Sequence, residues 1–130
     1  MYKSLINKAR EARKGAYAPY SGITVGAALL CHDGTVFTGC NIENAAYSPS
    51  LCAERTAFAK AISSNFRKFE AIAICGGDKT NEMSLFYPCG VCRQWMQEFC
   101  DKTFKIIVVD DNGSIVIYTL DELLPYAFSL

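Results

Sequence analysis

Three of the seven cysteines in this 130-residue sequence have spacings that suit a metal site. Cys89 and Cys92 form a CxxC pair, and Cys52 stands earlier in the chain, inside Cys52-Ala53-Glu54. Each group lies where a predicted loop leads into a predicted helix, and there the helix dipole and free backbone N–H groups stabilise a thiolate. The starts of two helices can therefore bring three thiolates to one point.

The number of available ligands favours a catalytic metal site over a structural one. A structural zinc site is closed by four protein ligands, whereas a catalytic site has three and leaves one position for water. The single histidine, His32, falls in a predicted hairpin turn, which disfavours it as a fourth ligand. A closed four-cysteine site and a metal-free CxxC redox pair are the less favoured alternatives. The other cysteines have apolar surroundings typical of small buried side chains; they are Cys31, Cys40, Cys75 and Cys100.

Glu54, two residues after Cys52, is the candidate proton carrier. A carboxylate beside an open zinc position can take a proton from water and return it to a leaving group. The simpler alternative is a surface carboxylate that complements the dipole of a helix's first turn. The spacing C-x-E followed by P-C-x-x-C is typical of zinc-dependent deaminases, which favours the catalytic role.

The remaining pattern predicts the elements that must position these residues. An amphipathic helix is expected from Leu5 to Ala16, and a short capped helix is expected at the end, through Leu123 and Leu124. Between them the sequence predicts strands at 24–31, 35–40, 70–75, 105–110 and 114–118, and helices at 52–64 and 90–100. This order predicts a single α/β domain over residues 1–130, built as a three-layer α/β/α sandwich with a five-stranded mixed sheet.

Composition excludes several classes of protein. Thirteen Lys and Arg residues balance thirteen Asp and Glu residues, which disfavours a dedicated nucleic-acid binder. A hydrophobic fraction of 51% with 20% charged residues excludes a disordered chain. No apolar run approaches the ~20 residues that span a bilayer, so no membrane partner is expected. The segment 1–15 has no signal-peptide core, and the predicted location is cytoplasmic.

Six collinear segments cover nearly the whole chain, and together they resemble the small, homotetrameric, all-cysteine class of cytidine deaminases. The matching segments are Tyr17-Ala18-Pro19-Tyr20-Ser21, Val25-Gly26-Ala27-Ala28, Gly39-Cys40-Asn41-Ile42-Glu43-Asn44-Ala45-Ala46-Tyr47, Cys52-Ala53-Glu54-Arg55-Thr56-Ala57, Pro88-Cys89-Gly90-Val91-Cys92-Arg93-Gln94 and Leu123-Leu124-Pro125-Tyr126-Ala127-Phe128. The resemblance implies a cytidine deaminase-like fold.

The resemblance also implies one zinc ion per chain, held by Cys52, Cys89 and Cys92, with Glu54 as the proton shuttle. In this family the arginine after the glutamate, here Arg55, donates hydrogen bonds to the thiolates. Three thiolates and Zn²⁺ together carry a net charge of −1, which makes the bound water less acidic. A guanidinium that donates hydrogen bonds to the thiolates withdraws negative charge and restores that acidity.

The substrate contacts implied by the resemblance are Asn41, Glu43, Asn44, Tyr47, Ala53 and Phe128. Asn41 and Glu43 would hydrogen-bond a ribose hydroxyl, since an amide and a carboxylate offer the donors and acceptors that a sugar requires. The alternative for Asn44 is a structural role in an Asn-rich turn, and the alternative for Tyr47 is a core position. Phe128 is expected to close the pocket of a neighbouring subunit in a homotetramer, and the alternative is that it folds back onto its own core.

One position departs from the family pattern, and the role of a second position is left open. The family commonly has an aromatic residue two positions before the Val-Gly-Ala-Ala run, packed against the pyrimidine, and this sequence has Ile23 there. Base contact is expected to be weaker unless Tyr47 or another aromatic side chain substitutes. Arg93 is expected either to assist Arg55, to lie on a solvated helix face, or to contact another subunit.

The function implied is hydrolytic deamination of cytidine and deoxycytidine to uridine and deoxyuridine, with release of ammonia, in pyrimidine salvage. The alternatives are a deaminase of a cytosine-containing antibiotic nucleoside, a polynucleotide deaminase, and a non-catalytic structural zinc-binding module. The segment Asn41-Ile42-Glu43-Asn44 argues against the first and the zero net charge argues against the second. Glu54 would have no purpose in the third.

Overall fold

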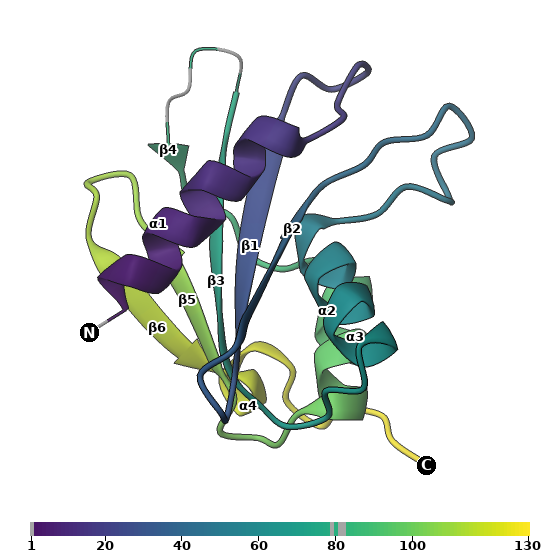
Figure 1. Cartoon of the computed structure of the whole chain (residues 1–130), viewed down its shortest axis with the longest axis vertical. Coiled ribbons are helices and arrows are strands. Elements are labelled where there is room, and N and C mark those ends of the chain that lie inside the picture. The colour runs from purple at the N-terminus through teal and green to yellow at the C-terminus, as the bar shows by residue number, and fades with distance from the viewer. Residues whose placement is uncertain (1, 79, 81–82) are drawn as a thin grey trace.

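A mixed β-sheet runs through the centre of the chain, and helices cover both of its faces (Figure 1). The computed structural model describes residues 2–78, 80 and 83–130. The main strands are arranged in the order β2-β1-β3-β5-β6, with β3 and β5 parallel and the other neighbours antiparallel. They are β1 (Thr24–Cys31), β2 (Val36–Cys40), β3 (Phe69–Gly77), β5 (Lys105–Val109) and β6 (Ile115–Thr119).

The predicted five-stranded sheet is confirmed, with one addition. The two-residue strand β4 (Met83–Ser84) pairs antiparallel with the end of β3, at Gly76 and Gly77. The sequence predicted no strand or helix between the strand at 70–75 and the helix at 90–100, because two paired residues leave no periodic pattern. Strand β3 also extends two residues beyond its predicted end at 75.

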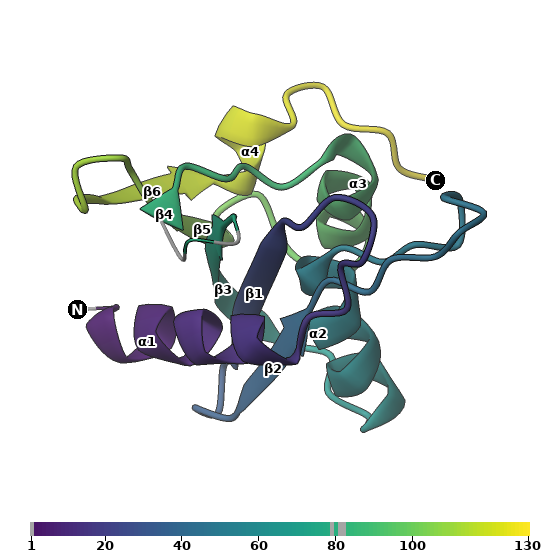
Figure 2. The same cartoon turned by 90° about the horizontal axis from the view of Figure 1, so that it is seen from above.

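The helices form the two outer layers of the predicted sandwich, as Figures 1 and 2 show. They are α1 (Lys3–Ala12), which continues as a short 3₁₀ helix η1 (Arg13–Gly15), α2 (Ala53–Ser63), α3 (Gly90–Phe99) and α4 (Leu120–Leu123). Along β3 the side chains alternate between the two faces of the sheet. Ala71, Ala73 and Cys75 pack in the cluster that contains α1, whereas Ile72 and Ile74 pack in the cluster that contains α2 and α3.

Two glycines allow helices to lie unusually close to the sheet. A Cβ atom on Gly26 would lie 1.9 Å from the carbonyl oxygen of Ala9 in α1. A Cβ atom on Gly39 would lie 2.5 Å from the carbonyl oxygen of Ala53 and 2.5 Å from the nitrogen of Ala57. The second contact sets the position of the first turn of α2 on β2, and therefore the position of Cys52, which precedes that turn.

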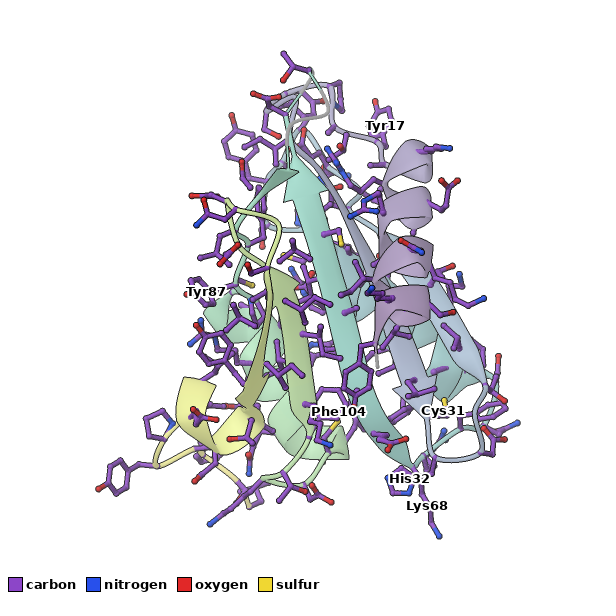
Figure 3. All side chains as sticks on the ribbon, turned by 90° about the vertical axis from the view of Figure 1, so that its left-hand side faces the viewer. Tyr17, Cys31, His32, Lys68, Tyr87 and Phe104 are labelled. Carbon is purple, nitrogen blue, oxygen red and sulfur yellow. The ribbon has the colours of Figure 1, made fainter. Side chains whose placement is uncertain are left out.

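The start of β1 lies beside the ends of β2 and β3, since Gly26 pairs with Cys40 and Thr24 pairs with Gly77. The loop after β2 returns from this edge of the sheet to the start of α2. At the other end of the sheet, His32 lies in the exposed turn between β1 and β2, beside Lys68 (Figure 3). Within the described residues, no helix has the length and apolar character needed to cross a membrane.

Candidate active site and metal centre

The structure brings the sulfur atoms of Cys52, Cys89 and Cys92 together, all within 4.8 Å of one another. Cys52 and Cys89 are the N-cap residues of α2 and α3, and Cys92 lies in the first turn of α3. The Sγ–Sγ distances are 3.7 Å between Cys52 and Cys89 and 3.5 Å between Cys89 and Cys92. Zn–S bonds of about 2.3 Å in a tetrahedral site imply a spacing of about 3.8 Å between sulfurs. The cluster therefore fits a zinc ion.

Proton binding by these thiols is strongly interdependent. The pKa of Cys52 is lowered to about 5 by its hydrogen bond to Cys92 and by the Arg55 guanidinium, although burial opposes the shift. The pKa of Cys92 is raised by the same hydrogen bond to Cys52, by burial and by the charge of Glu54. One thiolate forms easily, but ionising its neighbour as well requires a compensating cation. The cluster therefore has the charge requirement of a metal site as well as its geometry.

Glu54 projects from the second position of α2 and its side chain is only 4% exposed. It shares the buried face of the helix with Ala57, Phe58 and Ala61, which are three, four and seven residues later. Burial raises the pKa of Glu54 to about 7, and the charge of Cys52 adds to the shift. The alternative of a surface carboxylate is therefore wrong. A buried carboxyl group that titrates near neutrality suits general acid–base catalysis, the role that the sequence predicted for Glu54.

Arg55 lies against the thiol cluster. Its Nη2 donates to the Sγ atom of Cys52 and to the carbonyl oxygen of Ser50, both at 3.4 Å. Burial by itself lowers the pKa of Arg55, but the Cys52 and Cys92 sulfurs raise it more, so the guanidinium stays charged. Its Nε is buried without a hydrogen-bond partner among the described residues. Arg55 therefore places a positive charge where the thiolates concentrate negative charge.

A cavity of about 710 Å³ opens beside the cluster. Its volume is within the range of small-molecule sites. The predicted site residues that line it are Asn41, Glu43, Tyr47, Cys52, Ala53, Glu54, Arg55 and Cys89. Two of the three cluster cysteines, Cys52 and Cys89, therefore border the same space as Asn41 and Glu43 of the proposed sugar site.

The loop side of this cavity carries an exposed aromatic side chain, that of Tyr47. Tyr47 lines it with a side chain that is 73% exposed and a backbone φ of 62°, which is rare for a bulky residue. The alternative of a core position for Tyr47 is therefore wrong, and the side chain lies at the cavity as expected. Its ring contacts that of Tyr20 edge-on, with the centroids 6.5 Å apart.

Residues 1–110 match the protein family described as "Cytidine and deoxycytidylate deaminase zinc-binding region". The chain belongs to this family. A cytidine deaminase from Sporosarcina psychrophila is 48% identical over 127 residues, which cover 98% of this chain and 90% of that protein. A cytidine deaminase from Halalkalibacterium halodurans is also 48% identical, over 96% of this chain and 92% of that protein. The resemblance inferred from the sequence segments is confirmed.

Solved structures of the family agree on the fold. The crystal structure of cytidine deaminase from Burkholderia pseudomallei has a TM-score of 0.89 and 42% identity, and the match covers 98% of this chain and 99% of that one. The cytidine deaminase from Mycobacterium tuberculosis has a TM-score of 0.81 and 36% identity, with 99% and 98% of the two chains covered. The predicted cytidine deaminase-like α/β fold is confirmed.

Two residues that the family resemblance places at the substrate lie outside the main cavity of the single chain. Asn44 lines a smaller adjoining cavity of about 300 Å³, and its Oδ1 accepts a hydrogen bond from the N–H of Ala46 at 2.9 Å, as in a turn. Phe128 is 67% exposed, so it does not fold back onto its own core. Its assignment to a neighbouring subunit's site stays a prediction.

Two aromatic residues of the cavity, Phe86 and Tyr87, were not predicted from the sequence. Phe86 lines the cavity together with Ile23, and its ring packs so closely on Gly76 that a Cβ atom there would lie 2.6 Å from it. Tyr87 also lines the cavity, and its hydroxyl is 3.2 Å from that of Tyr118 on β6. Two aromatic side chains therefore line the same cavity as Ile23. Both residues lie in the aperiodic segment before Pro88, where only tertiary contacts reveal what they line.

Arg93 links the metal cluster to the C-terminal segment. Its Nε donates to the carbonyl oxygen of Pro88 at 2.8 Å, directly before Cys89, and its Nη1 donates to that of Leu123 at 2.6 Å. Gln94 next to it donates to the carbonyl oxygen of Phe128 at 3.1 Å. Arg93 is half-buried and engaged by these carbonyls, so the solvated helix face, one of the three alternatives for this residue, is wrong.

Proposed function

We propose that this chain is a cytidine deaminase that hydrolyses cytidine and deoxycytidine to uridine and deoxyuridine and releases ammonia. The observation that carries the proposal is the position of Glu54. Its buried carboxyl group lies on the wall of a nucleoside-sized cavity, next to a cluster of three thiols that fits zinc. A structural zinc module would gain nothing from a carboxyl group buried in this way.

A zinc ion held by Cys52, Cys89 and Cys92 would supply Lewis acidity, which makes water a nucleophile near neutral pH. The chain's own groups then handle the protons. Glu54 accepts a proton from the water that attacks C4 of the pyrimidine and delivers it to N3. It then carries the second proton of that water to the departing amino group, which leaves as ammonia. The carbonyl group of uridine remains at C4.

The pKa of Glu54 suits both halves of this task. A carboxyl group that titrates near pH 7 is basic enough to take a proton from water and acidic enough to give it up. Arg55 balances part of the thiolate charge through its contact with Cys52. Without that balance, the excess negative charge would make the attacking water less acidic.

The other parts of the proposal rest on the family. We infer that the active unit is a homotetramer of single-domain chains, with Phe128 of one subunit closing the pocket of another, and that it acts in cytoplasmic pyrimidine salvage. The exposed ring of Phe128 and its absence from the cavity of its own chain support this role. A deaminase of an antibiotic nucleoside is less favoured because Asn41 and Glu43 are both present at the cavity.

The test uses purified protein mixed with cytidine or deoxycytidine, with ammonia and the uracil nucleoside quantified and zinc measured on the same sample. The expected result is one ammonia per uracil nucleoside formed and one zinc per chain. Zinc-loaded protein that turns over neither nucleoside would overturn the proposal and favour a structural module. Turnover confined to modified cytosine nucleosides would favour the antibiotic alternative.

A further inference from the structure

The carboxylate of Glu43 is held by a short segment that the mechanism does not otherwise use. Its Oε1 accepts hydrogen bonds from the backbone N–H groups of Tyr20 at 2.9 Å and Ser21 at 3.2 Å. Its Oε2 accepts the hydroxyl of Ser21 at 2.5 Å. These bonds, the Ser21 hydroxyl first, lower the pKa of Glu43, so the group is an ionised acceptor at neutral pH. The carboxylate is therefore fixed in place before any ligand binds.

A count of hydrogen-bonding positions shows what remains for a ligand. A carboxylate offers about four acceptor positions, and three of those on Glu43 are already used. Two of the three are on Oε1, so the free position is on Oε2, the oxygen that Ser21 holds. Glu43 and Ser21 both line the main cavity. The free position can accept one O–H group.

Asn41 offers the complementary half. Its Oδ1 accepts the N–H of Val25 at 2.8 Å, and its Nδ2 donates to the carbonyl oxygen of Ile23 at 2.9 Å. One N–H of the amide remains to donate to a ligand. Together, Asn41 and Glu43 therefore offer one donor and one acceptor, which are the two partners that a single hydroxyl group requires.

The orientation of the Ser21 hydroxyl is itself determined. Ser21 Oγ accepts the N–H of Ile23 at 3.0 Å, so its single proton points to Glu43. Ile23 lines the same cavity. The serine thus connects the carboxylate to a residue on the wall of the pocket, and removing its hydroxyl would free Oε2 to rotate and to bind water.

We propose that Ser21 is a positioning residue that orients Glu43 so that Oε2 accepts one particular hydroxyl of the substrate's sugar. Ser21 thereby sets the preference of the enzyme among nucleosides with different sugars. This inference rests on the proposed function, because it assumes a nucleoside in the cavity. It adds to that function a residue, Ser21, that does not touch the reacting atoms and whose effect on substrate binding depends on the sugar.

The experiment compares Ser21→Ala with the wild-type protein on four substrates: cytidine, 2′-deoxycytidine, 5′-deoxycytidine and 2′,3′-dideoxycytidine. For cytidine, KM should rise about tenfold with kcat within about twofold, because a hydrogen bond to a charged group is lost from binding. That penalty should disappear for the sugar that lacks the hydroxyl bound by Glu43. Ser21→Thr, which keeps the hydroxyl, should restore the wild-type KM.

The matched control is Ser63→Ala. Ser63 is exposed at the end of α2, where its hydroxyl also donates a hydrogen bond, to the carbonyl oxygen of Lys60 at 3.1 Å. This variant should change KM for no sugar. If Ser21→Ala does not fold, Ser21→Cys retains the size of the side chain with a much weaker donor, and the same penalty is expected of it.

A penalty of equal size on all four sugars would overturn the proposal, because it would mean that Ser21 only stabilises the loop. An unchanged KM for every sugar would overturn it as well. Binding of the corresponding uracil nucleosides, measured by calorimetry, gives the same comparison without turnover. Protein that binds them with the expected Ser21 dependence but deaminates nothing would therefore contradict the proposed function and still support the role of Ser21.

Discussion

At one end of the cavity the functional side chains project from the first turns of two helices, whereas at the other end they belong to loops. Cys52, Glu54 and Cys92 are held by α2 and α3, which pack on the sheet. Asn41 and Glu43 are held by hydrogen bonds to the segment 20–25. The helix end is buried around Glu54, and the loop end is open to solvent at Tyr47.

This contrast assigns different tasks to the two ends. A proton shuttle and a metal cluster need fixed distances, and packed helices provide them. Sugar recognition needs directed donors and acceptors, and hydrogen-bonded loops provide these at the surface. Changes at the helix end should therefore alter metal content or kcat, and changes at the loop end should alter KM.

The largest effect is expected at the metal cluster. Cys89→Ala should abolish zinc binding and all detectable turnover, because two thiols cannot replace the three-ligand site. Zinc per chain after dialysis, measured by atomic absorption, checks the prediction. His32→Ala is the control, since His32 lies in the exposed turn at the other end of the sheet, and it should retain zinc. Zinc lost from the His32 variant would show that the ligand set is different.

The next effect is expected at the proton shuttle. Glu54→Gln should retain zinc and fold, yet lose at least ~10²–10⁴ in kcat, because general acid–base steps contribute that much. Glu70→Gln, at an exposed position on β3, is the matched control and should be as active as the wild type. Steady-state kinetics on zinc-matched samples distinguish the two. A Glu54→Gln variant with near-normal kcat would contradict the assignment.

Although Glu54→Gln should lower kcat, it should make the zinc-free chain more stable. Since burial raises the pKa of Glu54 from 4.5 to about 7, the unfolded chain ionises first as the pH rises, and the wild type loses stability between these values. At pH 8 the variant should therefore be more stable by about 3 kcal/mol, and at pH 5 by only about 1 kcal/mol. Urea unfolding after chelation checks this. An equal difference at both pH values would mean that the carboxyl group does not titrate as stated.

At the loop end, Asn41→Ala should raise KM for cytidine about tenfold and change kcat much less, because one hydrogen-bonding partner of the sugar is lost. The amide also holds Val25 and Ile23, so the variant should unfold at a lower temperature than the wild type. Kinetics and thermal unfolding measured together check both parts. A loss confined to kcat would break the proposed division between the two ends.

The smallest effect concerns the C-terminal segment. Phe128→Ala chains mixed with Glu54→Gln chains should regain up to about a quarter of the wild-type activity, if the pocket of each chain is closed by the Phe128 of another. Some pockets would then combine an intact Glu54 with an intact Phe128. Subunit exchange is verified by mass spectrometry of differently labelled chains. Exchanged mixtures that never exceed the sum of the two parents would contradict the shared pocket.

By itself, the sequence was enough to predict the order of the four main helices and the five main strands, the three-thiol cluster and its glutamate. Most of these features depend on short spacings along the chain: helical and strand periodicity, a CxxC pair, and a glutamate two residues after a cysteine. Such spacings survive in any fold that keeps the helices intact. Cys52 lies 37 residues before Cys89, and it was joined to the CxxC pair because both stand at predicted helix starts and because of the family resemblance. The burial of Glu54 could also have been read from its spacing with Ala57, Phe58 and Ala61.

Only the tertiary structure decided which distant segments meet. It placed Phe86 on Gly76, tied Arg93 to the carbonyl oxygens of Pro88 and Leu123, and set Ser21 against Glu43. It also left the side chain of Asn44 in a turn outside the main cavity. These contacts join loops that are far apart in the sequence and carry no periodicity. Their geometry follows from how the sheet and helices pack, which local spacing does not encode.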